Sequence, residues 1–579
     1  MITFVASIQW GDGTNLASGV LVVPGSADMA KQEFSRRGFI GSSGAAVLAG
    51  LASQIGAQTA VGETPSTGVA GEVRRKQTPA QPNLVLFMPD EMRADALACY
   101  GNPLTRTPNF DKLAQDGTRF ANCHVQFPVC GASRCSLLTG WPTSVRGHRS
   151  LFYFLRPDEP NMFRYLREAG YDVFWYGKND ALAAESFYDS VTMWNYPDPP
   201  SARTPRVQHK PRPTGGKITG PDTFIGQETG DRAATPEYAS IQSAIRILER
   251  KETDRPFCIF LPLSSPHPPY GSPEGFNDMY SPADIHGLRP RDLPRKPGYI
   301  SSIRKEYGLN GLSEDTFRKI RALYYGMVSF SDWLLGELLE AIERTNHNQD
   351  TAVFVLSDHG DYAGDYGLVE KWPSGLEDTL THVPLIASVP GGAQGHISEN
   401  MVELFDVMAT CLDLAQTEAR HTHFARSLMP QIHGGAGDPG RAVFSEGGYN
   451  TYEPQCFEDN DQTPGSLYYP KEHLEVTHPE DVSRAAMVRT HEYKLVSRPQ
   501  GQSELYIYKD DPQELHNRFG DRDVSHIQCD LQQQLLHWYV NTTGIAPFDK
   551  DQRECPPYYA TPSFPQSIQA SVRSILDKG

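Results

Sequence analysis

Two pairs of residues with metal-binding side chains lie far apart in the chain, and each pair follows an apolar run of strand length. Asp90 and Glu91 follow one run, and Asp358 and His359 follow the other. In sheets of parallel strands, ligands gather at the carboxyl ends of the strands, so one site could hold both pairs. Carboxylate oxygens with a single imidazole favour calcium, magnesium or manganese over zinc.

A cysteine is the other reactive group. Its surroundings read Cys130-Gly131-Ala132-Ser133-Arg134-Cys135-Ser136-Leu137-Leu138-Thr139-Gly140. The sequence predicts a helix that starts near Ala132–Ser133, and free amides at a helix N-terminus favour an anion. Arg134 can pair with charge nearby. Taken alone, the spacing of Cys130 and Cys135 is more typical of a buried structural cysteine or of a bridge across one helical turn.

The motifs together resemble those of the sulfatase family. The run from Cys130 to Gly140 is similar to the signature C-x-P-S-R-x-x-L-x-T-G, with Ala132 in place of the proline. In that family the cysteine is oxidised to formylglycine, the group that attacks the sulfate ester. The chain resembles the family over roughly residues 83–520, with its motifs in family order.

The resemblance implies a metal site and a modified side chain. Asp90, Glu91, Asp358, His359 and the formylglycine made from Cys130 would hold the metal. Calcium is the usual family metal, and magnesium or manganese is possible. A maturation enzyme would oxidise Cys130, and the substrate would be a sulfated saccharide or an aryl sulfate. One hydroxyl of the hydrated aldehyde would attack sulfur and form a covalent sulfate ester.

The resemblance also implies roles for five basic residues. Lys178, Lys371 and Arg134 would stabilise charge on the transferring group. His267, within a P-H-x-P-Y pattern, or Lys371 would protonate the departing alcohol. His148 would take the proton from the second hydroxyl.

One position near the sulfate contacts departs from the family. Gly177-Lys178-Asn179-Asp180 stands where sulfatases commonly have G-K-x-H. One cationic contact is therefore missing or supplied elsewhere.

The order of predicted elements indicates an α/β fold with a mostly parallel central sheet, helices on both faces and a smaller C-terminal α+β lobe. Predicted strands are Asn83–Met88, Tyr171–Tyr176, Phe257–Leu263, Thr351–Leu356, Ala485–Val488, Tyr493–Val496 and Glu504–Tyr508. Predicted helices are Asn109–Gln115, Asn161–Glu168 and Glu314–Arg344. The predicted organisation is an N-terminal extension (1–60), a linker (61–82), a catalytic domain (83–440) and a C-terminal subdomain (441–579).

Composition and the N-terminus bear on partners and location. A net charge of −17 argues against unspecific nucleic-acid binding. Ser35-Arg36-Arg37-Gly38-Phe39-Ile40 resembles a twin-arginine export signal, and the apolar stretch after it is too weak for a membrane span. We therefore predict an exported protein, periplasmic or extracellular, and not an integral membrane protein. A basic stretch at 203–217 is either a solvated loop or a contact for an anionic substrate.

Two alternatives stay open. A phosphodiesterase or phosphonate monoester hydrolase of the alkaline phosphatase superfamily can share the fold, the formylglycine and the Asp-His pair. A non-catalytic binding protein would keep the fold and leave Cys130 unmodified. The sequence does not identify the alcohol that is released. We expect the loop around 195–235 to determine which substrate is bound.

Overall fold

The computed structural model describes residues 81–194, 224–226, 230–250, 255–458 and 468–546. All of these belong to one compact unit, Val73–Gly579. The predicted export signal, nearly all of the predicted linker, and the basic stretch at 203–217 lie outside the described residues.

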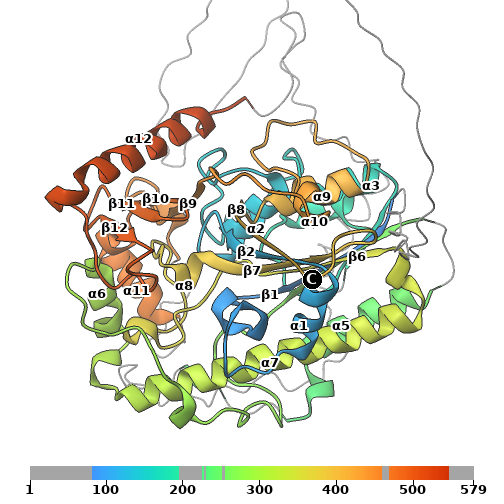
Figure 1. The fold of residues 1–579 in the computed structure, drawn as a ribbon, viewed down its shortest axis with the longest axis horizontal. Helices are drawn as coiled ribbons and strands as arrows, with labels where there is room; N and C mark the ends of the chain where they lie inside the picture. Colours follow the sequence, from blue (N-terminus) through green and yellow to red (C-terminus); the bar gives the residue numbers. More distant parts are fainter. Residues whose placement is uncertain (1–80, 195–223, 227–229, 251–254, 459–467, 547–579) are drawn as a thin grey trace, which may run out of the picture. The chain divides into compact units, whose positions relative to one another are not determined.

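The larger sheet has eight strands in the order β4-β3-β5-β1-β6-β7-β2-β8 (Figure 1). Five of the seven neighbouring pairs are parallel, and β7 pairs antiparallel with both β6 and β2. The strands are β1 (Asn83–Pro89), β2 (Thr118–His124), β3 (Asp172–Trp175), β4 (Met193–Trp194), β5 (Phe257–Leu263), β6 (Thr351–Leu356), β7 (His382–Ser388) and β8 (His396–Glu403).

Both faces of the large sheet are covered because its central strands are apolar on both sides. In β1, Val85 and Phe87 join one buried cluster, whereas Leu84 and Leu86 join the other. The first cluster packs under α1 (Pro108–Asp116), α5 (Pro236–Leu248) and α7 (Glu314–Arg344). The second packs under α3 (Met162–Glu168), α9 (Asp406–Leu414) and α10 (Met429–Ile432), and Figure 1 shows the two helical layers on opposite sides of the sheet.

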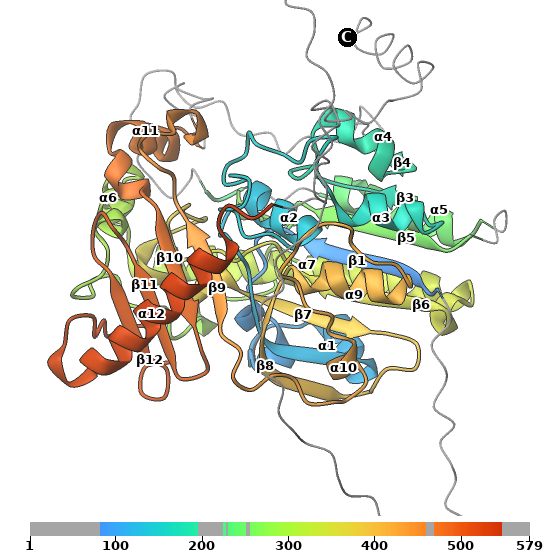
Figure 2. The ribbon, with the colours of Figure 1, turned by 90° about the horizontal axis from the view of Figure 1, so that it is seen from above.

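The smaller sheet is antiparallel in the order β12-β11-β10-β9 (Figure 2). Its strands are β9 (Val443–Gly447), β10 (Ala485–Arg489), β11 (Tyr493–Ser497) and β12 (Glu504–Ile507), and α12 (Ser525–Thr542) packs on one face. The other helices are α2 (Cys130–Thr139), α4 (Phe187–Ser190), α6 (Gly298–Glu306), α8 (Asp378–Thr381) and α11 (Tyr469–Thr477). The predicted α/β fold, with its mostly parallel sheet and smaller C-terminal lobe, is confirmed.

The turn after β12 joins the two sheets. Glu514 accepts a hydrogen bond from the backbone of Asp378 at 3.1 Å and pairs with the buried Lys494 of β11. Lys494 also lies 3.0 Å from the Asp378 carboxylate. Asn517 donates to the backbone oxygen of Arg295 at 2.8 Å. These buried charges are satisfied only when the lobes are packed together.

No helix within the described ranges is long and apolar enough to cross a membrane.

Candidate active site

Four neighbouring parallel strands, β3, β5, β1 and β6, deliver the predicted side chains to one edge of the large sheet. Asp90 directly follows β1, and Asp358 follows β6, which pairs with β1 in parallel. His267 follows β5 on the other side of β1, and Lys178 follows β3 beyond it. Asp90 and Asp358, which are 268 positions apart, therefore converge because their strands end at the same edge.

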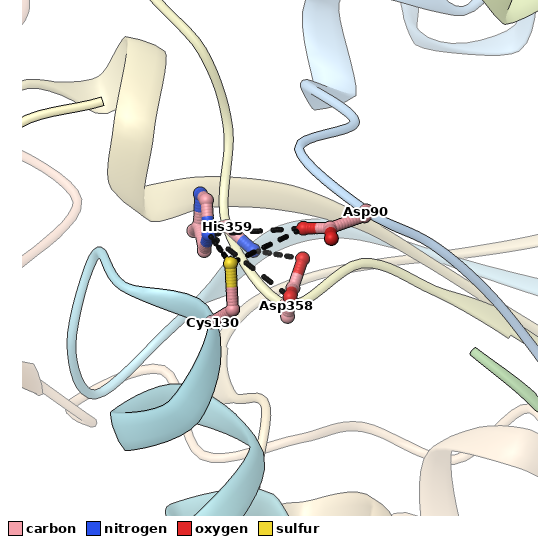
Figure 3. Close-up of side chains that lie close together, drawn as sticks. All are labelled: Asp90, Cys130, Asp358 and His359. Atoms are coloured by element: carbon pink, nitrogen blue, oxygen red, sulfur yellow. Dashed lines mark hydrogen bonds and ion pairs between the residues drawn. The ribbon is translucent and has the colours of Figure 1, made fainter. Parts of the chain in front are cut away.

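Cys130 is the first residue of α2, and its side chain points from that helix toward the strand ends (Figure 3). Its Sγ lies 3.2 Å from His359 Nε2, 3.5 Å from Asp90 Oδ1 and 3.6 Å from Lys178 Nζ. Burial raises the pKa of the thiol well above its usual value, and Asp90 adds to the effect. The group is therefore a poor thiolate nucleophile.

The helix α2 begins at Cys130, two residues before the predicted start near Ala132–Ser133. Its first helical hydrogen bond runs from the amide of Ser133 to Val129. The amide of Ala132 has no partner within the helix, so a proline at this position would cost no helical hydrogen bond.

Cys130 and Cys135 do not form a bridge, and both are free thiols. Cys135 Sγ instead lies 3.5 Å from the backbone oxygen of Ala181.

The four residues Asp90, Cys130, Asp358 and His359 could hold a metal ion, because their ligand atoms all lie within 4.8 Å of one another (Figure 3). All four are buried. His359 Nδ1 lies 2.9 Å from the backbone oxygen of Gly360, so Nδ1 carries the proton and the lone pair of Nε2 faces the cluster.

The electrostatics of this cluster fit a divalent cation. Burial and the charge of Asp90 raise the pKa of Asp358 to about 7. Burial also disfavours the ionised form of Asp90, but the positive charges of Lys178 and Arg134 hold the pKa of Asp90 well below its usual value. A bound cation would reduce the electrostatic repulsion between these two buried carboxylates.

Arg134 joins the two carboxylates. Its Nε donates to Asp358 at 2.8 Å, and one terminal nitrogen lies 3.2 Å from Asp90. Neither terminal nitrogen makes a hydrogen bond within the described part of the chain, although both are buried. They remain available to an anion or a hydroxyl group.

Lys178 lies between two carboxylates. Its Nζ is 2.6 Å from Asp90 and 2.9 Å from Asp180, which also lies 4.0 Å from Arg134. The departure from the family's G-K-x-H therefore places an acid against the lysine. Asp180 partly offsets the charge of Lys178, whose ammonium lies 3.6 Å from Cys130 Sγ.

Glu91 is not one of the four clustered residues. Its backbone has a φ of 66°, and its amide donates to Asp358 at 3.2 Å. Its Oε1 pairs with Lys371 and lies 3.1 Å from His267 Nε2. Lys371 Nζ and His267 Nε2 are 3.1 Å apart. This geometry groups Glu91 with the predicted proton donors, although its carboxylate, Cys130 and His267 also form a second set of possible ligands.

Replacing Glu91 with glutamine should separate these two roles. We expect calcium to raise the unfolding temperature of E91Q by as much as it raises that of the wild type. We expect the kcat of E91Q to fall by about a hundredfold, because Lys371 loses the carboxylate that fixes it. Calcium-dependent thermal unfolding and steady-state kinetics measure both, with the exposed Glu314→Gln on α7 as the control. Loss of the calcium effect in E91Q would identify Glu91 as a ligand.

The structure does not bring His148 into contact with Cys130. Its Nδ1 lies 2.7 Å from the backbone oxygen of Tyr153, and its Nε2 lies 3.0 Å from Glu159. Both ring nitrogens are thus engaged elsewhere, and the role predicted for His148 as proton acceptor gains no support from this geometry.

Sequence reasoning missed Tyr468, which belongs to no motif. Its ring packs edge-on against the ring of His267, with centroids 6.4 Å apart and an interplanar angle of 66°. No signal in the sequence could have found it, because Tyr468 lies 201 positions after His267 and the two meet only in the folded chain.

Comparisons with known proteins agree with the motifs. A family model described as Sulfatase matches residues 82–417, and one described as N-sulphoglucosamine sulphohydrolase, C-terminal, matches residues 450–541. The chain therefore belongs to the sulfatase family of the alkaline phosphatase superfamily, a family of enzymes.

Curated relatives are distant. Human iduronate 2-sulfatase is 27% identical over 348 residues, which cover 56% of this chain and 62% of the relative, less than two thirds of its length. A protein of Trinickia caryophylli described as multifunctional alkaline phosphatase superfamily protein PehA is 26% identical, covering 79% of this chain and 95% of the relative. N-acetylglucosamine-6-O-sulfatase of Bacteroides thetaiotaomicron is 23% identical, covering 80% of this chain and 87% of the relative.

Solved structures share the fold. A phosphonate monoester hydrolase from Silicibacter pomeroyi aligns with a TM-score of 0.64 at 22% identity, covering 80% of this chain and 96% of that one. A structure in complex with its substrate D-glucosamine-2-N,6-O-disulfate aligns with a TM-score of 0.60 at 20% identity, covering 81% and 100%.

Proposed function

We propose that this protein is a sulfuric ester hydrolase that uses formylglycine made from Cys130 and a divalent metal. The observation that carries the proposal is the position of Cys130 Sγ, buried between the Asp90–Asp358–His359 group and Lys178. Calcium is the proposed metal, with magnesium or manganese as alternatives. The proposed substrate is a sulfated carbohydrate or an aryl sulfate, in keeping with relatives named for sulfated sugars.

The residues around Cys130 divide into two groups with different tasks. Asp90, Asp358, His359 and the modified residue 130 would hold the cation. When bound, the cation supplies positive charge that stabilises the transferring group, and the hydrated aldehyde supplies an oxygen nucleophile. Lys178 and Arg134, which lie close to Cys130, would donate hydrogen bonds to the oxygens of the sulfate.

Lys371 and His267 serve the departing alcohol in this proposal. Burial disfavours the protonated form of Lys371, but acidic neighbours such as Glu91 hold the pKa of the lysine well above its usual value. Burial and the charge of Lys371 lower the pKa of His267. Lys371 Nζ therefore stays protonated and His267 Nε2 accepts a hydrogen bond from it, and either Lys371 or His267 would give the proton to the leaving oxygen.

The maturation and location of the protein also remain proposals. A maturation enzyme would oxidise Cys130, and the twin-arginine-like segment would direct export to the periplasm or the outside of the cell. Residue 132 is an alanine at the third position of α2, so the modifying enzyme must accept C-x-A-x-R.

A phosphonate monoester hydrolase is the second candidate, because two solved structures that share the fold carry that name. Both ester classes carry one negative charge, so the same cations suit both. The test compares kcat/KM for 4-nitrophenyl sulfate with that for an aryl phosphonate monoester and an aryl phosphodiester. We expect the sulfate to be preferred, and a clear preference for either phosphorus ester would remove the sulfatase proposal.

A further inference from the structure

Tyr468 brings the C-terminal part of the chain to the side of the site where the alcohol would leave. It directly precedes α11 and lies within the segment matched by the second family model, residues 450–541. Its ring packs against His267, whose Nε2 lies 3.1 Å from Lys371 Nζ. Tyr468 therefore adjoins the two residues proposed to serve the leaving oxygen.

Within the described part of the chain, the hydroxyl of Tyr468 makes no hydrogen bond, and its side chain is only partly buried. Burial and the charge of Glu370 raise the pKa of the phenol, while Lys371 and Lys178 act in the opposite direction. These interactions show that the group lies among the charges of the site and stays protonated there.

The backbone that carries Tyr468 is fixed by buried charges. Lys471 of α11 pairs with Glu458 at 3.1 Å, and Glu475 accepts a hydrogen bond from the amide of Glu458 at 2.9 Å. The hydroxyl of Tyr449 donates to Glu458 at 3.2 Å. Because these contacts already hold the backbone in place, the Tyr468 side chain can contact a ligand without a large loss of conformational freedom.

From this arrangement we propose that Tyr468 binds the alcohol part of the substrate, with its ring against the ring of a saccharide or aryl group and its hydroxyl as a hydrogen-bond donor. The inference rests on the proposed function and adds to it the residue that would contact the ring of the substrate's alcohol. An aromatic side chain suits this task because it offers apolar area and a polar tip at little cost in conformational entropy.

The test compares Tyr468→Ala and Tyr468→Phe with the wild type and with Tyr452→Ala, a control at a tyrosine that is 90% exposed. For 4-nitrophenyl sulfate we expect KM to rise about tenfold in Y468A and a few-fold in Y468F, because the first loses the ring and the second only the hydroxyl. The inhibition constant of inorganic sulfate should stay within about twofold in both, because sulfate occupies the other side of the site.

A second readout does not depend on turnover. In the Cys130→Ala background, the Kd for 4-nitrophenyl sulfate should rise in Y468A by the same factor as KM, measured by calorimetry. An unchanged KM and Kd in Y468A would overturn the inference. A parallel rise in the inhibition constant of sulfate would also overturn it, because Tyr468 would then contact the transferred group.

Failure of the proposed function gives a different result. A wild type that hydrolyses a phosphonate monoester but no sulfate ester removes the sulfatase proposal alone. The same variants are then compared on 4-nitrophenyl phenylphosphonate, with phenylphosphonate as the inhibitor, and the same pattern supports or overturns the role of Tyr468.

Discussion

Cys130→Ala is expected to abolish ester hydrolysis, with a loss of at least about 10⁴-fold in kcat, and to leave the fold intact. The side chain of Cys130 is buried at the centre of the cluster, where its Sγ faces His359, Asp90 and Lys178. Alanine suits the first turn of a helix, so the change removes the reactive group with little effect on α2. Steady-state rates and the thermal unfolding midpoint measure the two expectations.

The same helix provides a matched control. Cys135 is also buried, but its Sγ lies 3.5 Å from the backbone oxygen of Ala181 and is not one of the proposed metal ligands. Cys135→Ala should therefore keep kcat within a few-fold of the wild type. A Cys130→Ala protein with normal activity would contradict the mechanism, whereas an unfolded one would be recognised from its melting curve.

Asp358→Asn is expected to remove metal binding and to lower kcat/KM by about a thousandfold, the equivalent of several kcal/mol of lost charge stabilisation. Asp358 contributes one of the two strand-end carboxylates and accepts a hydrogen bond from Arg134. Asparagine keeps the volume and removes the charge. Calcium should then no longer raise the unfolding temperature, as it does when a ligand binds only the folded protein.

The control for this variant is Asp315→Asn on α7, whose side chain is 84% exposed. It should retain both the calcium effect and the activity. Full calcium stabilisation in Asp358→Asn would show that the cation binds elsewhere, and the assignment of the ligands would fail.

The sequence was sufficient to predict the scaffold of the site. β1 and β6 are fully buried and apolar after their first residue, and an acid that follows such a run lies at the sheet edge. Parallel pairing then brings Asp90 and Asp358 together without further information. The position of the next side chain could not be predicted in the same way. Glu91 has a φ of 66°, and its carboxylate pairs with Lys371.

Other parts of the site depend on tertiary packing that spacing does not encode. His148 follows the Cys130 motif in the sequence, but in the folded chain its ring nitrogens contact Glu159 and the backbone oxygen of Tyr153. Asp180 departs from the family pattern, and only the structure shows that it pairs with Lys178. Tyr468 reaches His267 from the C-terminal part of the chain.

The central claim is that Cys130 is the precursor of formylglycine, and the mass of the tryptic peptide containing Cys130 from the native host tests it most directly. We predict a peptide about 18 Da lighter than the cysteine form, the difference that oxidation of the side chain to an aldehyde produces. A protein that hydrolyses the ester while every copy of this peptide carries unmodified cysteine would contradict the account.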